Sequence, residues 1–212
     1  KNLVDYNKTL AQRNALLKYF AINRTFNQDN LEIYNHQMNE LSEPIHKKRT
    51  AFMKAFIPIF KQRYDSISAN TESVDIHYQS DLNKSDMKQL LSQNLERDKV
   101  LQYTSVGIHK DDLDFEINDV PIKKFGSQGQ QKTFLIALKL AQFDFIRKVA
   151  EVNPIVLLDD IFDKLDQNRV SQTIKLFENE TIGQIFISDT HEDRIKEVLS
   201  NTSSKYEIFN LN

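Results

Sequence analysis

The sequence predicts an α/β fold in which a helical first part is followed by a sheet flanked by helices. In residues 10–68 apolar side chains recur at three- and four-residue steps, which is the period of a helix packed along one face. From Ser127 onward, helical segments alternate with short apolar runs, an order typical of a parallel sheet covered by helices. One run ends in Asp159 and Asp160, and a parallel strand would deliver this acid pair to the sheet edge at which ligands bind.

The helical part contains two prolines, Pro44 and Pro58. Each lacks an amide donor, so we expect each to start, end or kink a helix nearby. The apolar stripe therefore predicts a helix or a short helical hairpin packed on a neighbour, and the prolines disfavour a long dimerising coiled coil. The stripe consists of Tyr34, Met38, Leu41, Ile45, Phe52, Ala55 and Ile59.

The middle of the chain predicts a strand, a helix and a hairpin. The strands show the alternation of apolar and polar residues that a half-buried strand requires. Asn83 or Ser85 is expected to cap the helix, and Asn118 and Asp119 supply the hairpin turn. In order, the elements are a strand at 74–78, a helix with Met87, Leu90, Leu91 and Leu95 on one face, and hairpin strands at 113–117 and 120–122.

The last third predicts helices and strands in alternation. The helices are expected at residues 127–149, 167–177 and 192–199, and the strands at 155–158, 184–187 and 206–209. The chain then divides into a helical part (1–73), a mixed strand and helix segment with the hairpin (74–125), and a carboxy-terminal α/β part (126–212).

The helix that starts near Ser127 has the features of an anion site. Ser127 can cap this helix, and Gly129 lets a ligand approach the backbone. Free amide groups and the helix dipole then point at the anion, for which triphosphate is the natural candidate. A Mg2+ ion bound to phosphates fits the carboxylates that end the strand. The alternative is a plain helix cap, which is a common feature of proteins.

No G-x-x-x-x-G-K-[ST] sequence occurs in the chain. A phosphate-binding loop of this type cannot be built from the four glycines, which are Gly107, Gly126, Gly129 and Gly183. We therefore expect the loop to lie in a part of the protein that precedes Lys1, and the 212-residue chain alone to be inactive as an ATPase.

These segments together resemble the RecF family of the ABC-type ATPases of DNA repair. Residues 127–132 look like the ABC signature motif, residues 157–160 like the Walker B strand, and residues 163–166 like the D-loop. Residues 12–18 and 107–113 resemble RecF sequences rather than ABC proteins at large, so the resemblance spans nearly the whole chain. The departures from the usual family pattern are Ile108 and Lys110.

The resemblance implies a partial P-loop ABC-type ATPase fold with a helical arm lobe. It implies an ATP-dependent homodimer, in which the signature segment of one subunit closes over the γ-phosphate of ATP held by the other. That segment consists of Ser127, Gln128, Gly129, Gln130, Gln131 and Lys132.

The resemblance also assigns roles to the acidic residues. Asp159 would orient Mg2+ and its waters, and Asp160 would orient or activate the attacking water. Leu165 and Asp166 of the D-loop would lie across the dimer interface, although Asp166 is also a natural helix cap. His191 falls near the switch histidine of ABC proteins, and a solvated loop histidine is the alternative.

DNA is the partner that the family implies. ATP binding would drive dimerisation on DNA at gaps and at junctions of single and double strands, where RecO and RecR help to load RecA and slow hydrolysis resets the dimer. The alternatives are an SMC-like ATPase head, which would need longer heptads, and a non-enzymatic helical interaction module. The best basic candidates for DNA contact are Lys47, Lys48, Arg49, Lys61 and Arg63, although such runs are usually solvated helix faces.

Amino-acid composition narrows the possible partners, metal sites and cellular compartment of the protein. With 28 basic and 30 acidic side chains, no global field favours nucleic acid, so DNA contact requires a local patch. The chain has no cysteine, which excludes disulfides and thiolate metal sites. No apolar run approaches the roughly 20 residues of a membrane span, and no secretory signal opens the chain. We expect a cytoplasmic protein that does not bind membranes.

Overall fold

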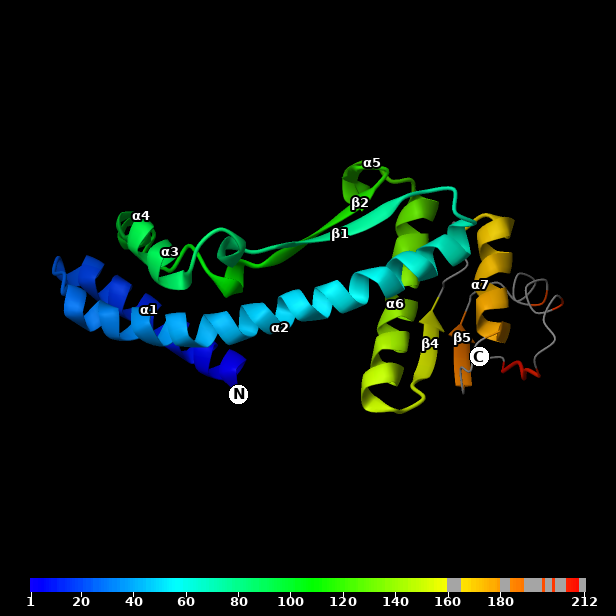
Figure 1. The fold of residues 1–212 in the computed structure, drawn as a ribbon, viewed down its shortest axis with the longest axis horizontal. Coiled ribbons are helices and arrows are strands. Elements are labelled where there is room, and N and C mark those ends of the chain that lie inside the picture. Colours follow the sequence, from blue (N-terminus) through cyan, green and yellow to red (C-terminus); the bar gives the residue numbers. More distant parts are fainter. Residues whose placement is uncertain (160–164, 180–183, 189–195, 197–199, 201–204, 210–212) are drawn as a thin grey trace. The chain divides into compact units, whose positions relative to one another are not determined.

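The computed structural model describes residues 1–159, 165–179, 184–188, 196, 200 and 205–209 (Figure 1). Its mixture of helices and strands confirms the predicted α/β class. The chain divides into two compact units, which we call unit 1 (Lys1–Lys54 with His77–Asp114) and unit 2 (Ala55–Ile76 with Phe115–Asn212). The predicted boundaries at residues 73 and 125 stay predictions.

Two helices make up the helical first part, α1 (Asn2–Asn23) and α2 (Gln28–Ser68). The expectation that Pro44 and Pro58 start or end helices is wrong, because α2 runs through both. Each proline removes one of many helix hydrogen bonds, and side chains buried on both sides of each proline hold the helix together.

The predicted stripe is correct only in the first half of α2. Met38 and Ile45 are buried, whereas Phe52 and Ala55 are exposed. In the second half of α2, the sequence offers two series of apolar residues at helical spacing. The series that is buried is not the predicted one. The buried residues of the second half are Met53, Phe56, Phe60, Tyr64 and Ile67.

Unit 1 contains four short helices and two apolar clusters, the smaller of which consists of Leu17, Phe20 and Leu31. The short helices are η1 (Asp81–Asn83), α3 (Met87–Gln93), α4 (Leu95–Leu101) and η2 (Ile108–Lys110). The cap of α3 is Asp86, which accepts a hydrogen bond from the Gln89 amide at 2.8 Å, so the expected cap at Asn83 or Ser85 is wrong. The larger cluster consists of Tyr6, Met38, Ile45, Met87, Leu90, Leu91, Val106 and Ile108.

A three-stranded sheet contains the predicted strand and hairpin. Its order is β1 (Val74–Gln79), β2 (Asp112–Ile117) and β3 (Val120–Pro121). Asn118 and Asp119 have positive φ angles of 49° and 62°, as a tight hairpin turn between antiparallel strands requires. Ile122 begins helix α5 (Ile122–Phe125) and is not a strand residue, because Pro121 cannot donate to a further ladder bond.

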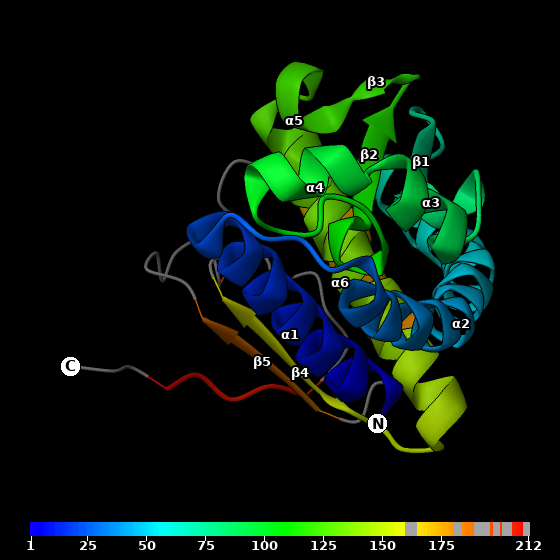
Figure 2. The same cartoon turned by 90° about the vertical axis from the view of Figure 1, so that its left-hand side faces the viewer.

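Unit 2 contains the predicted alternation of helix and strand. Helices α6 (Gln128–Ala150) and α7 (Gln167–Asn179) alternate with strands β4 (Ile155–Asp159) and β5 (Gln184–Ser188). The two strands pair in parallel, side by side in Figure 2. The predicted helix at 192–199 lies almost wholly outside the described residues, and residues 205–209 form no strand where one was predicted.

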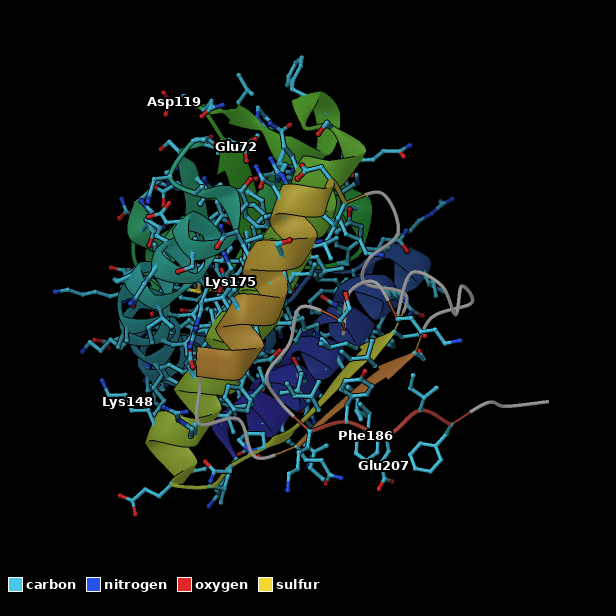
Figure 3. The ribbon with its side chains drawn as sticks, turned by 90° about the vertical axis from the view of Figure 1, so that its right-hand side faces the viewer. Glu72, Asp119, Lys148, Lys175, Phe186 and Glu207 are labelled. Carbon is cyan, nitrogen blue, oxygen red and sulfur yellow. The ribbon has the colours of Figure 1, made fainter. Side chains whose placement is uncertain are left out.

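Strand β4 is buried on one face only. Leu158 is buried, whereas Ile155 and Leu157 are 60% and 74% exposed. Phe186 of β5 projects from the sheet and is half exposed (Figure 3). A strand that is central and buried on both faces is therefore not seen in the described part of the chain, where this sheet has two strands. Among the described helices, none is both long and apolar enough to cross a membrane.

Candidate functional site

The start of α6 has the geometry that the sequence predicts. The Ser127 hydroxyl accepts a hydrogen bond from the Gln130 amide at 3.2 Å, and the Gln130 side chain accepts one from the Ser127 amide at 2.8 Å. This reciprocal capping box occupies the Gln130 amide and leaves the backbone amides of Gln128 and Gly129 at the open end of the helix. Ser127, Gln128 and Gln131 are exposed, and Gly129 is half-buried. An anion has free access to this helix end.

Gly126 fixes the approach of the chain to this site. A Cβ atom at Gly126 would lie 2.6 Å from Cγ1 of Ile122 and 2.7 Å from its carbonyl oxygen. Gln131 donates to the carbonyl oxygens of Gly126 and Ile122 at 3.0 and 3.3 Å, which ties α5 to α6. The turn before Ser127 therefore tolerates no side chain.

The end of β4 carries an exposed carboxylate. Asp159 stands opposite Ser188 in the parallel register and accepts a hydrogen bond from its hydroxyl. One carboxylate of this kind, together with phosphates and water, matches the way proteins usually hold Mg2+. No group of three or more potential metal ligands occurs among the residues that the structure describes. Asp160 and His191 lie outside those residues.

Asp166 caps α7. Its Oδ1 accepts from the Arg169 amide at 2.9 Å, and its Oδ2 lies 3.1 Å from Nε of Arg169. The helix-cap role of Asp166 is therefore present in the fold, and its place across a dimer interface stays a prediction. The neighbouring Leu165 is half-buried.

Sequence reasoning missed Glu72, which joins α6 to α7. Its carboxylate accepts from Gln130 of α6 and from Arg169 of α7, each at 2.8 Å. Glu72 lies in the loop between α2 and β1, far in sequence from both partners. No local pattern marks such a residue, because its role depends on contacts across the fold.

Most of the predicted DNA-contacting residues are ion-paired. Arg49 lies 2.5 Å from Asp111, Lys61 lies 2.8 Å from Asp75, and Arg63 lies 2.5 Å from Asp144. Lys47 pairs with Glu43 at 2.7 Å on the surface of α2. Lys48 is exposed and has no ion pair within the described residues. Their contact with DNA stays a prediction.

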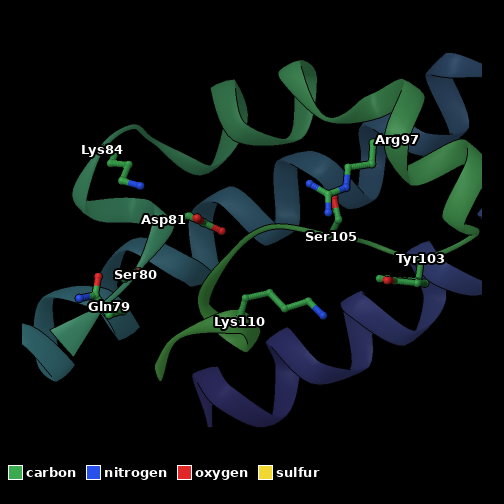
Figure 4. A pocket seen from close by; sticks show the side chains of 8 residues that line it. All are labelled: Gln79, Ser80, Asp81, Lys84, Arg97, Tyr103, Ser105 and Lys110. Carbon is green, nitrogen blue, oxygen red and sulfur yellow. The ribbon is translucent and has the colours of Figure 1, made fainter. Parts of the chain in front are cut away.

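A hollow of about 360 Å³ in unit 1 gathers three further cations (Figure 4). Lys84, Arg97 and Lys110 line it, and none forms an ion pair with a described residue. Lys110 lies 5.3 Å from the centre of the Tyr103 ring. One carboxylate, that of Asp81, faces the same hollow, so the lining carries a net positive charge.

Within the segment 107–113, Gly107, His109 and Asp111 make structural contacts. Gly107 has φ 114°, and a Cβ atom there would lie 2.6 Å from Cε of Met87. His109 donates from Nε2 to the Thr104 carbonyl and accepts at Nδ1 from the Tyr6 hydroxyl, both at 3.0 Å. Burial, more than any nearby charge, lowers the pKa of His109. Asp111 binds Arg49 and the Tyr78 hydroxyl.

The segment 12–18 is structural as well. Arg13 is fully buried and donates to Asp98 and Thr104 at 2.8 Å, and also to Asn35 at 2.8 Å. Asp98 in turn accepts from the amide and hydroxyl of Ser105. The two segments that resemble RecF outside the ATPase motifs therefore build the interior of unit 1.

Known proteins match this chain over nearly its whole length. It is 54% identical over 209 residues to the DNA replication and repair protein RecF of Flavobacterium johnsoniae, and 44% identical over 208 residues to that of Bacteroides thetaiotaomicron. The matches cover 99% and 98% of this chain, which spans 58% and 55% of the two relatives. No family model matches the sequence.

Two solved structures share the fold. They are described as the recombination mediator protein RecF in the RecFOR pathway, one as RecF-ATP and one as RecF-ATPrS. Their TM-scores are 0.76 and 0.75, at 28% and 27% sequence identity. The likeness covers 91% of this chain and 53% of each of the solved chains.

Proposed function

Because this chain belongs to the RecF family, we propose that it supplies the signature, Walker B and D-loop segments of an ATP-dependent DNA repair and replication protein. The capped and open start of α6 carries this proposal. Its outward-facing amides form a site for an anion, and the chain contains no phosphate-binding loop to fill that site from within. The anion is the γ-phosphate of ATP held by a second subunit.

Hydrolysis needs the acid pair Asp159 and Asp160. Asp159 would hold Mg2+, and Asp160 would orient the attacking water of ATP hydrolysis. Residues outside the 212 of this chain supply the loop that grips the β- and γ-phosphates. The exposed Ile155, Leu157 and Phe186 form an apolar face that is suited to packing against that remaining part.

The assembled dimer binds DNA, and RecO and RecR are its protein partners in the cytoplasm. Phosphates contact Lys48 and the three cations of the hollow in unit 1, because these side chains are not neutralised by an ion pair within the described chain. Lys47, Arg49, Lys61 and Arg63 contribute less, since each already binds a carboxylate.

Substitution of Ser127 by Arg in the full-length protein tests this function. The larger side chain blocks the approach of a partner's phosphate, so we expect ATP-dependent dimers to disappear while the monomer still binds ATP. Sedimentation with a non-hydrolysable ATP analogue measures the dimer, and a nucleotide-binding assay runs on the same sample. The control is Ser92→Arg, at an exposed position on α3. Normal dimers of the Ser127 variant would rule the proposal out.

A further inference from the structure

A single carboxylate connects the start of α6 to the start of α7. Figure 3 shows Glu72 beside the amino-terminal ends of both helices. Its Oε1 accepts from Nε2 of Gln130 and from a terminal guanidinium nitrogen of Arg169, both at 2.8 Å. Its Oε2 accepts from the Tyr64 hydroxyl at 2.6 Å. Since only 12% of the Glu72 side chain and 15% of the Arg169 side chain are exposed, water competes little for these bonds.

On the α6 side, the connection continues to the helix cap. The side-chain amide of Gln130 donates to Glu72 through its nitrogen and accepts from the Ser127 backbone amide through its oxygen. The amide is therefore fixed at both ends, and Glu72 determines the position of the side chain that closes the capping box.

On the α7 side, Arg169 links Glu72 to the D-loop acid Asp166, and a second hydrogen bond links Arg169 back to α6. Arg169 lies 3.1 Å from the carboxylate of Asp166 and donates to the buried Thr133 hydroxyl at 2.7 Å. The Thr133 hydroxyl donates in turn to the Gly129 carbonyl oxygen at 2.8 Å. Hydrogen bonds and ion pairs thus join Ser127 to Asp166 without a break, and Glu72 stands at the centre.

The protonation states of the cluster support a permanent connection. Burial alone would raise the pKa of Glu72, but hydrogen bonds from Tyr64, Gln130 and Arg169 outweigh it and hold the pKa below its usual value. Burial, and then the Glu72 carboxylate, raise the pKa of Tyr64. At neutral pH Glu72 is therefore ionised, Tyr64 is a donor, and Arg169 is charged.

We infer that Glu72 is a positioning residue, which holds the signature segment and the D-loop acid in one fixed arrangement so that both meet the partner's nucleotide together. The inference rests on the proposed function, in which the two segments contact the same partner subunit. Without the Glu72 charge, Arg169 loses its more buried counter-ion and keeps the exposed Asp166, and the acceptor that orients Gln130 becomes a neutral amide oxygen in place of a carboxylate oxygen.

A second ion pair in unit 2 provides a matched control. Arg63 contacts Asp144 of α6 through two nitrogens, and the side chains are 13% and 17% exposed. This pair is as buried as Arg169 with Glu72, yet Asp144 lies roughly 18 Å further along α6 than the signature segment, at the helical rise per residue. Glu72→Gln and Asp144→Asn each replace a carboxylate by an amide of the same shape, so each takes the same charge away from a largely buried guanidinium.

The test compares these two variants in the full-length protein. We expect both to lower the melting temperature, because each removes a carboxylate counter-ion from a largely buried arginine. Only Glu72→Gln is expected to raise the dissociation constant of the dimer at least tenfold with a non-hydrolysable ATP analogue, while ATP binding by the monomer changes less than twofold. Equal dimer affinity of the two variants would overturn the inference.

Hydrogen exchange separates this inference from the proposed function. In the 212-residue chain without nucleotide, Glu72→Gln is expected to speed exchange at the amides of Gln130 and Gln131, which donate to Ser127, and Asp144→Asn is not. If the parent dimerises with nucleotide but exchange at these two amides is the same in both variants, the role of Glu72 is refuted and the proposed function stands. If the parent fails to dimerise, both are refuted.

Discussion

Each unit contains a buried arginine paired with a carboxylate, and the two pairs differ in what surrounds them. In unit 1, Arg13 and Asp98 are both fully buried and bind each other and the buried or half-buried side chains of Thr104, Asn35 and Ser105. In unit 2, Arg169 and Glu72 lie just below the surface and bind the caps of two helices. The difference suggests two kinds of family segment: those that build the interior, and those that we propose present backbone amides or carboxylates to a ligand.

The largest effect is expected from Arg13→Leu. The substitution leaves Asp98 as a buried carboxylate without its counter-ion, which typically costs about 3–5 kcal/mol. Chemical denaturation of the 212-residue chain measures the change in the free energy of unfolding. A cost below about 1 kcal/mol would show that the pair does not hold unit 1 together.

Gly107→Ala is expected to lower the free energy of unfolding somewhat less than Arg13→Leu does. Its φ of 114° is a conformation that side chains rarely adopt, and the new Cβ would collide with Met87 and Tyr6. Strain and overpacking together amount to roughly 2–4 kcal/mol. The control is Ala69→Gly in unit 2, which exchanges Ala and Gly at a positive φ of 53° and should cost nothing. Equal stability of the two variants would show that the conformation of Gly107 does not matter.

Acidification should weaken unit 1 more than unit 2. Because the folded-state pKa of His109 lies below 6.5, the unfolded chain takes up the proton first. The neutral His109 therefore makes its full contribution to the free energy of unfolding above pH 6.5, and this contribution is lost as the pH falls through the folded-state pKa of His109. Urea unfolding at about pH 7.5 and about pH 5.5, monitored by hydrogen exchange in each unit, measures this. In His109→Gln the dependence in unit 1 should flatten.

The smallest effect is expected on DNA affinity. Salt dependence is measured as the slope of the logarithm of the duplex-binding constant against the logarithm of the salt concentration. Replacing Lys84, Arg97 and Lys110 by Gln should make this slope shallower by up to about 0.9 for each phosphate that these side chains neutralise. The control replaces three exposed lysines of the same unit by Gln, namely Lys8, Lys18 and Lys88. Fluorescence anisotropy over a salt series distinguishes the two. Equal slopes for the two triple variants would show that the hollow does not contact DNA.

The sequence predicted the elements better than their packing. The cap at Ser127, the hairpin turn at Asn118 and Asp119, and strand β4 all follow local rules, and the structure contains them. The path of α2 through two prolines was missed, because packing along a long helix outweighs the local cost of each proline. Glu72 was missed because three tertiary contacts, and no local pattern, define it.

The central claim is that the signature segment acts on ATP held by the other subunit, and a mixing experiment tests it most directly. Ser127→Arg and Asp160→Asn variants of the full-length protein are each expected to be inactive. In a mixed dimer, ATP held by the Ser127→Arg subunit meets the intact signature segment of the Asp160→Asn subunit, while its own Asp160 is intact. Mixing the two variants is therefore expected to restore ATP turnover. If the mixture is no more active than its separate components, the signature segment does not act in trans.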